Sequence, residues 1–268
     1  HTGKKANIKF NPALINHGIK FQRIDLKDKP IINADVDNVV TVERGTTLSQ
    51  NNATVATVEH LLAAIVGLQI DNILIQIDGE EIPILDGSSI EFLECLESCE
   101  FKDQDAARNY IEISDKIHYK DDKNNVEIAI YPHNNHRITC MVDYNSEILG
   151  SQHHTLNKLS KFKDEISRAR TFCFLHEIEE LFNKNLIKGG DLNNAIVIVD
   201  KVLDKIKLDK ISKMMGRKKV KVKKEGILNN TELKYKNEPA RHKLLDIIGD
   251  LALVGRPIKG HIIAARPG

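Results

Sequence analysis

Two apolar helices, each followed closely by an apolar strand, are the feature that most limits how this chain can fold. Residues 59–68 (EHLLAAIVGL) precede the strand ILIQI, and residues 241–253 (RHKLLDIIGDLAL) precede the strand HIIAA. Each helix begins with a charged residue followed by a histidine. Because an apolar helix face must be buried against another element, the repeat predicts an α+β fold of two similar halves packed face to face. This arrangement would bring both histidines to the interface. The alternative is that any two amphipathic helices look alike.

The remaining sequence reads mainly as short strands, with further helices expected at 90–99, 175–185 and 201–215. Alternating or β-branched residues indicate strands in 7–10, 19–26 and 39–48. The segments 110–119, 124–132 and 136–144 resemble antiparallel strands joined by polar turns. The polar stretch 101–109 interrupts the pattern, and it divides the chain into domains 1–106 and 107–268.

Composition excludes several classes of protein. The chain has 39 basic and 38 acidic residues, a balance that argues against a dedicated binder of polyanions. Its 4 cysteines include no C-x-x-C pair, so we expect neither a disulfide framework nor a cysteine zinc knuckle, and a reducing cytoplasm fits best. The longest apolar stretch, Leu61 to Ile70, is shorter than the roughly 20 residues of a membrane-spanning helix, so we expect no transmembrane segment.

A basic run occupies Arg217 to Lys224. Valines alternate with lysines in part of it, a pattern that favours an exposed strand whose lysines protect a sheet edge. Nucleic-acid binding is the alternative, but no aromatic residue is interleaved with the run and no binding motif flanks it. We therefore expect no nucleic-acid partner.

The spacing His242-x-x-x-Asp246 places an imidazole and a carboxylate on one helix face, where both can hold one metal ion. Asp250 lies one turn further along the same face. The same spacing also arises by chance on ordinary helices. Leucine and isoleucine surround this pair, however, and a polar pair beside a buried stripe needs a partner.

Glu59 and His60 open the first apolar helix. A lone histidine in such a helix is commonly a hydrogen-bonded core residue, but the adjacent carboxylate suits a general base for a metal-bound water. Three ligands, His60, His242 and Asp246, would leave a fourth position open, as catalytic zinc sites do. Nitrogen and oxygen donors also suit other divalent metals.

Several motifs together resemble one enzyme family. The motifs are TVEHLLAA at 57–64, IDNILIQIDGEEIPILDGSS at 70–89, ISRARTF at 166–172 and RHKLLDIIGDLALVG at 241–255. They are similar, in sequence and order, to the zinc-dependent UDP-3-O-acyl-N-acetylglucosamine deacetylases of lipid A biosynthesis in Gram-negative bacteria. The resemblance implies two α+β domains, each a helix layer packed on a β-sheet, with the active site between them.

The resemblance also implies a role for each matching residue of the metal site. Glu59 matches the general base. The zinc ligands match His60, His242 and Asp246.

Four further residues match positions of the family's active site. Lys243 matches a substrate-binding lysine, and Phe172 matches a residue that lines the substrate site. Thr171 matches the residue whose hydroxyl helps to hold the developing oxyanion, and Asp250 matches an acidic residue that supports the catalytic histidine.

The chain departs from the family pattern in two places. The family's general-acid histidine would follow Gly268, and the expected first strand would precede His1, so we expect both ends to be shortened. Segment 201–232 resembles a longer insert found in members fused to a hydroxyacyl-carrier dehydratase, which makes a fused domain an expectation for the parent protein.

The sequence therefore predicts a cytoplasmic zinc amidohydrolase. Its expected reaction is an early committed step of lipid A biosynthesis: water hydrolyses the N-acetyl group of UDP-3-O-acyl-N-acetylglucosamine and releases acetate. The alternative is a non-catalytic fragment that binds a metal or ligand, because the general-acid histidine lies beyond Gly268.

Overall fold

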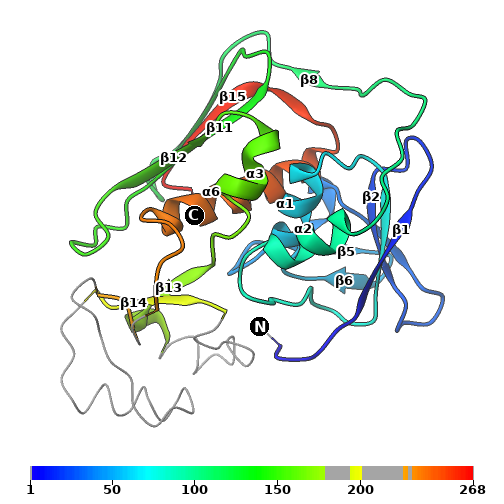
Figure 1. Ribbon diagram of the computed structural model, residues 1–268, viewed down its shortest axis with the longest axis horizontal. Helices are drawn as coiled ribbons and strands as arrows, with labels where there is room; N and C mark the ends of the chain where they lie inside the picture. Colours follow the sequence, from blue (N-terminus) through cyan, green and yellow to red (C-terminus); the bar gives the residue numbers. More distant parts are fainter. Residues whose placement is uncertain (1, 179–193, 201–225, 229–230, 268) are drawn as a thin grey trace.

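The computed structural model describes residues 2–178, 194–200, 226–228 and 231–267 (Figure 1). The helix expected at 175–185 falls within the described residues only over 175–178, which are helical. The helix expected at 201–215 and the basic run at 217–224 lie outside the described residues.

The first domain is built on a four-stranded sheet. Its strand order is β1-β7-β2-β3, and β7 runs antiparallel to β1 and parallel to β2. Helix α1 (Glu59–Gly67) immediately precedes the central strand, and α2 (Ile90–Glu97) follows it. The strands are β1 (Ile8–Pro12), β2 (Ile19–Arg23), β3 (Ile31–Asn33) and β7 (Ile73–Ile77).

The second domain repeats this plan. Its sheet has the order β12-β11-β15-β10-β9, and the short strand β8 (Ile111–Glu112) pairs with β15. Helix α6 (Glu238–Leu251) precedes the central strand β15, which runs antiparallel to β10 and parallel to β11. The other strands are β9 (Ile117–Asp121), β10 (Val126–Tyr131), β11 (His136–Val142), β12 (Gln152–Leu156) and β15 (Ile258–Ala265). The predicted α+β fold of two similar domains is thus confirmed.

Each domain carries an insertion between its outer strand and its central helix. In the first domain the insertion is the three-stranded sheet β4 (Val39–Thr41), β5 (Thr47–Gln50) and β6 (Ala53–Val55). In the second it contains the short helix α3 (Phe162–Glu165) and the parallel pair β13 (Phe172–Phe174) and β14 (Ile196–Ile198). We call these the first and second insertions.

The strand pairing of the second domain differs in part from the sequence expectation. Strands β9 and β10 form the expected antiparallel pair, but β10 and β11 are not neighbours. Strand β15, from the end of the chain, lies between them. Every second residue of β15 is buried. The residue patterns of β10 and β11 are local, so they do not indicate that a strand from a distant part of the sequence lies between them.

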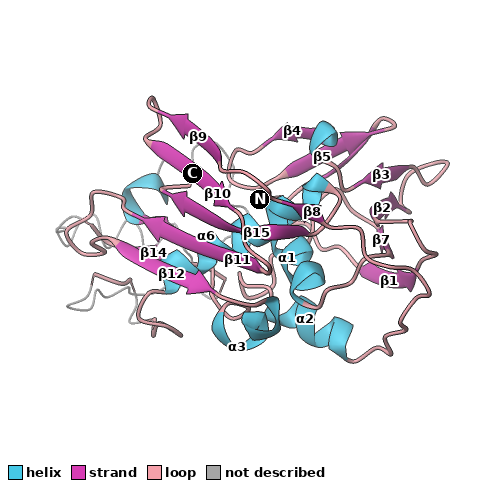
Figure 2. Ribbon diagram, turned by 90° about the horizontal axis from the view of Figure 1, so that it is seen from above, coloured by secondary structure: helices cyan, strands magenta, loops and turns pink. Residues whose placement is uncertain are grey.

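Helices α1 and α6 pack against each other between the two sheets (Figures 1 and 2). Every residue of α1 from Glu59 to Ile65 is buried, which explains why this helix is apolar on all sides. No helix in the described ranges has the length and apolar character needed to cross a bilayer.

Gly249 sets how closely the two helices approach. A Cβ atom at this position would lie 2.0 Å from the carbonyl oxygen of Glu59, so only glycine fits the crossing. Glycine in a helix interior costs about 1 kcal/mol relative to alanine, and it is usually retained for packing. Gly249 was not predicted from the sequence, although a glycine inside a helical pattern is a visible signal of close packing.

Gly249→Ala is therefore expected to lower the Tm. Overpacking against backbone atoms typically costs about 1–3 kcal/mol. For a chain of this size that corresponds to a fall of roughly 3–10 °C, measurable by calorimetry. A Tm equal to that of the wild type would contradict the assigned helix contact.

Candidate metal centre

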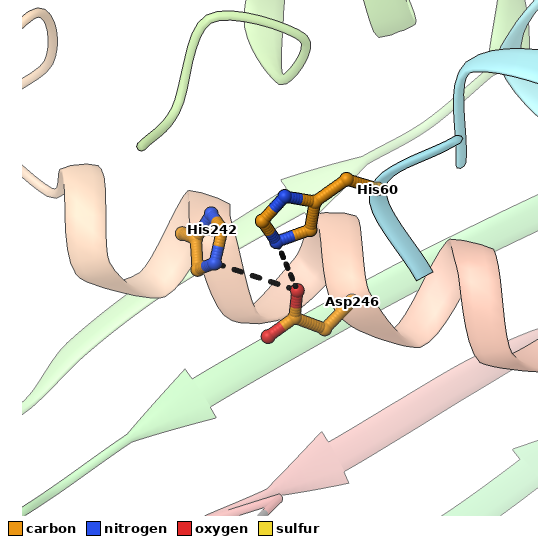
Figure 3. A group of neighbouring side chains, drawn as sticks. All are labelled: His60, His242 and Asp246. Carbon is orange, nitrogen blue, oxygen red and sulfur yellow. Dashed lines mark ion pairs between the residues drawn. The ribbon is translucent and has the colours of Figure 1, made fainter. Parts of the chain in front are cut away.

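The helix crossing brings His60, His242 and Asp246 together (Figure 3). His60 is the second residue of α1, while the other two lie four residues apart on one face of α6. One donor atom of each residue lies within 4.8 Å of the others. The Nε2 atoms of His60 and His242 lie 3.6 and 3.4 Å, respectively, from Oδ1 of Asp246. The three side chains therefore converge on one small volume.

An unsatisfied polar atom indicates that this cluster fits a metal ion. Oδ1 of Asp246, the oxygen that the Nε2 atoms of both histidines approach, is buried and has no hydrogen-bond partner. Leaving such an atom unpaired is costly unless another group binds there. A tetrahedral zinc ion with bonds of about 2.0–2.1 Å needs donor atoms about 3.4 Å apart, close to the separations observed. The donor set of two imidazoles and one carboxylate suits zinc.

Hydrogen bonding and charge prepare these ligands for a cation. The Nδ1–H of His242 donates to the carbonyl of Ala169 at 3.0 Å, which leaves Nε2 free to bind. Burial, helped by the neighbouring His242, lowers the pKa of His60 to about 4, so this imidazole is neutral at pH 7. Burial opposes ionisation of Asp246, but the adjacent His242 and Lys243 outweigh it and lower its pKa. A neutral imidazole at His60 and an ionised carboxylate at Asp246 are forms that bind metal.

Glu59 and Asp250 flank the cluster and share a partner. The Glu59 side chain is buried, and its Oε2 accepts a hydrogen bond from the backbone N–H of Thr46 at 2.9 Å. The hydroxyl of the same Thr46 donates to Oδ1 of Asp250 at 2.7 Å. Thr46 was not among the site residues predicted from the sequence. A threonine in a turn gives no signal of contact with two distant helices.

The segment 169–172 runs beside the start of α6. Ala169 accepts the bond from His242, and the Phe172 ring lies 6.3 Å from the His242 ring in a T-shaped arrangement. Thr171 is anchored through its backbone, with its N–H donating to Gly87 at 2.7 Å. Phe172 thus lies beside the cluster, and Thr171 precedes it in the same anchored segment.

Lys243, the other residue expected to bind substrate, lies on α6 next to the cluster. Its Nζ donates to Oδ2 of Asp246 at 3.2 Å, the carboxylate oxygen that does not face the two histidines. This contact places a positive charge at the edge of the candidate site.

A buried ion pair fixes segment 169–172 to α6. Glu238, the first residue of the helix, is 0% exposed. Its Oε1 accepts hydrogen bonds from the backbone N–H and the Nε of Arg170 at 3.0 and 2.9 Å. A carboxylate at a helix N-terminus also interacts favourably with the helix dipole. This ion pair was not predicted from the sequence, although the glutamate before Pro239 at the helix start is visible there.

Comparison with known proteins adds an independent result. The family described as "LpxC: UDP-3-O-acyl N-acetylglycosamine deacetylase" matches residues 1–214 and 211–268. The chain is 46% identical over 268 residues to "Bifunctional enzyme LpxC/FabZ" of Bacteroides thetaiotaomicron, and 48% identical over 271 residues to the protein of that name in Chlorobaculum tepidum. These matches cover the whole chain but 58% of each relative's length.

A shorter relative is matched over more of its length. The "UDP-3-O-acyl-N-acetylglucosamine deacetylase" of Teredinibacter turnerae is 36% identical over 271 residues, and the match covers the whole chain and 81% of that relative.

Proposed function

The chain belongs to the family of UDP-3-O-acyl N-acetylglycosamine deacetylases, and we propose that it hydrolyses the N-acetyl group of UDP-3-O-acyl-N-acetylglucosamine in lipid A biosynthesis. Water is the second substrate, and acetate and a free amine are the products. The observation that carries this proposal is the cluster His60, His242 and Asp246 with the carboxylate of Glu59 beside it. A purely structural metal site has no need for this fourth residue, whose buried carboxylate lies beside the three ligands.

Zinc is the proposed cofactor, held by His60, His242 and Asp246. When bound, it would polarise the acetamide carbonyl and lower the pKa of water. Glu59 then accepts the proton from the attacking water, because its carboxylate lies next to the ligands and is fixed by Thr46. Burial and the neighbouring Asp246 carboxylate raise the pKa of Glu59 to about 8 in the metal-free protein. A bound zinc ion would oppose this shift and favour the ionised form that a base requires.

The remaining residues bind and orient substrate in this proposal. The hydroxyl of Thr171 donates to the developing oxyanion. Lys243 supplies a cation for the anionic substrate, and the partly exposed ring of Phe172 covers the sugar beside His242. Asp250 orients and supports the catalytic histidine that the family resemblance implies.

We also propose that the parent protein joins this chain to a second enzyme domain, a hydroxyacyl-carrier dehydratase. Two relatives with 46% and 48% identity are named bifunctional, and the chain corresponds to 58% of each. A cytoplasmic location completes the proposal. The 4 cysteines of the chain all lie among the described residues and are free thiols, which suits a reducing compartment.

The test is a deacetylation assay on the zinc-loaded protein in its full natural length. Incubation with UDP-3-O-acyl-N-acetylglucosamine should release one acetate for each free amine formed. Removal of zinc with a chelator should abolish turnover, and added zinc should restore it. Stoichiometric zinc without acetate release would instead favour the non-catalytic metal-binding alternative.

A further inference from the structure

Thr46 links strand β5 of the first insertion to helices α1 and α6. It lies immediately before β5 in the first insertion, and it is only 4% exposed. Its carbonyl accepts a hydrogen bond from the backbone N–H of Val58 at 3.2 Å, which fixes the insertion to the start of α1. Its N–H and hydroxyl reach Glu59 and Asp250, respectively. One residue therefore contacts both helices of the metal centre.

The two carboxylates depend on Thr46 in different ways. Glu59 is buried, so its carboxylate needs a donor within the protein. Asp250 as a whole residue is more exposed than Glu59, so packing confines its side chain less. Within the described part of the chain, the Thr46 hydroxyl is the only side-chain donor that the structure gives to Asp250. Loss of this hydroxyl would release the Asp250 carboxylate to other rotamers.

The turn that carries Thr46 is held from its other side as well. Arg44 forms an ion pair with Glu177 at 2.9 Å, and Glu177 also accepts a bond from the backbone N–H of Phe174 in β13. The two insertions therefore contact each other near this turn, and the contact restrains the loop that carries Thr46. A hydrogen-bond donor on a restrained loop holds a carboxylate in a better defined position than a donor on a mobile loop.

We propose that Thr46 is a positioning residue, which holds the carboxylates of Glu59 and Asp250 in a fixed orientation at the metal centre. This inference rests on the proposed deacetylase function. The backbone N–H of Thr46 holds Glu59, and its hydroxyl holds Asp250, which supports the catalytic histidine in the proposed function. Catalytic groups are sensitive to placement, and a displacement of 1 Å can cost about 100-fold in rate. Thr46 acts through the two carboxylates and needs no contact with substrate.

The test compares Thr46→Val, which keeps the shape and backbone N–H but loses the hydroxyl, with Thr46→Ser, which keeps both donors. In the full-length zinc-loaded protein, Thr46→Val should lower kcat by about 10- to 100-fold, with KM within about two-fold and zinc content unchanged. Thr46→Ser should recover most of the activity. Thr54→Val, on exposed strand residue Thr54 of the same small sheet, is the matched control.

Wild-type kcat in Thr46→Val, or equal losses in the valine and serine variants, would overturn the proposal. If valine lowers the Tm by more than about 5 °C, roughly 1–2 kcal/mol for this size of chain, Thr46→Ala replaces it with the same expectation. If the wild type releases no acetate, the deacetylase function fails, and crystal structures then decide the Thr46 question. The Asp250 carboxylate should change rotamer in Thr46→Val but not in Thr46→Ser, and an unchanged rotamer in both would refute the positioning role.

Discussion

Glu59→Gln is expected to abolish deacetylation while zinc content stays at that of the wild type. Glutamine has nearly the same shape and can still accept the hydrogen bond from Thr46, but it cannot take a proton from water. General-base catalysis typically contributes about 100- to 10,000-fold, so kcat should fall within that range. The measurement is acetate release together with metal analysis of the same sample. Glu94→Gln, at an exposed position of α2, is the matched control.

The thermal stability of the metal-free Glu59→Gln variant shows whether a loss of activity comes from the missing base or from unfolding of the protein. Burial, reinforced by the Asp246 carboxylate, raises the pKa of Glu59 from 4.5 to about 8. The native state then keeps a proton that the unfolded chain loses above pH 4.5, so wild-type stability falls between about pH 4.5 and pH 8. Glutamine avoids this loss. The variant should show a higher Tm than the wild type at pH 7, with a smaller difference at pH 5; a lower Tm at pH 7 would contradict a buried, uncharged Glu59.

His242→Ala is expected to remove zinc from the protein and turnover with it. The wild type should bind about one zinc per chain, because the three donors converge on one volume. Alanine deletes one donor and leaves the other two, which is insufficient for a tight site. The substitution also frees the Ala169 carbonyl, so segment 169–172 loses a link to α6. Metal analysis after dialysis and the deacetylation assay measure both effects.

A histidine outside the cluster controls for general loss of an imidazole. His261 in β15 contacts Thr139 of β11 at 2.9 Å, on the sheet face opposite the helices. His261→Ala should retain zinc. Undiminished zinc in His242→Ala, by contrast, would show that the metal lies elsewhere or that the cluster binds none.

Local patterns were sufficient for much of the fold. The sequence shows the apolar patterns of helices α1 and α6 and of the strands β7 and β15 that follow them. These patterns are local, because the residues that each element buries recur at that element's own helical or strand spacing. The similarity of the two halves was visible for the same reason. Strand order was not, since the insertion of β15 between β10 and β11 depends on backbone pairing between segments that are far apart.

The sequence by itself determined which of the candidate metal ligands share a helix face. His242 and Asp246 lie four residues apart, and a helix turns through slightly more than one full circle over that distance. Only the tertiary structure decided that His60 meets them, since this requires α1 and α6 to cross closely at Gly249. The same is true of Thr46, which is 204 residues from Asp250. Helical periodicity is a local property of the chain, whereas contacts between distant segments are fixed only when the whole core packs.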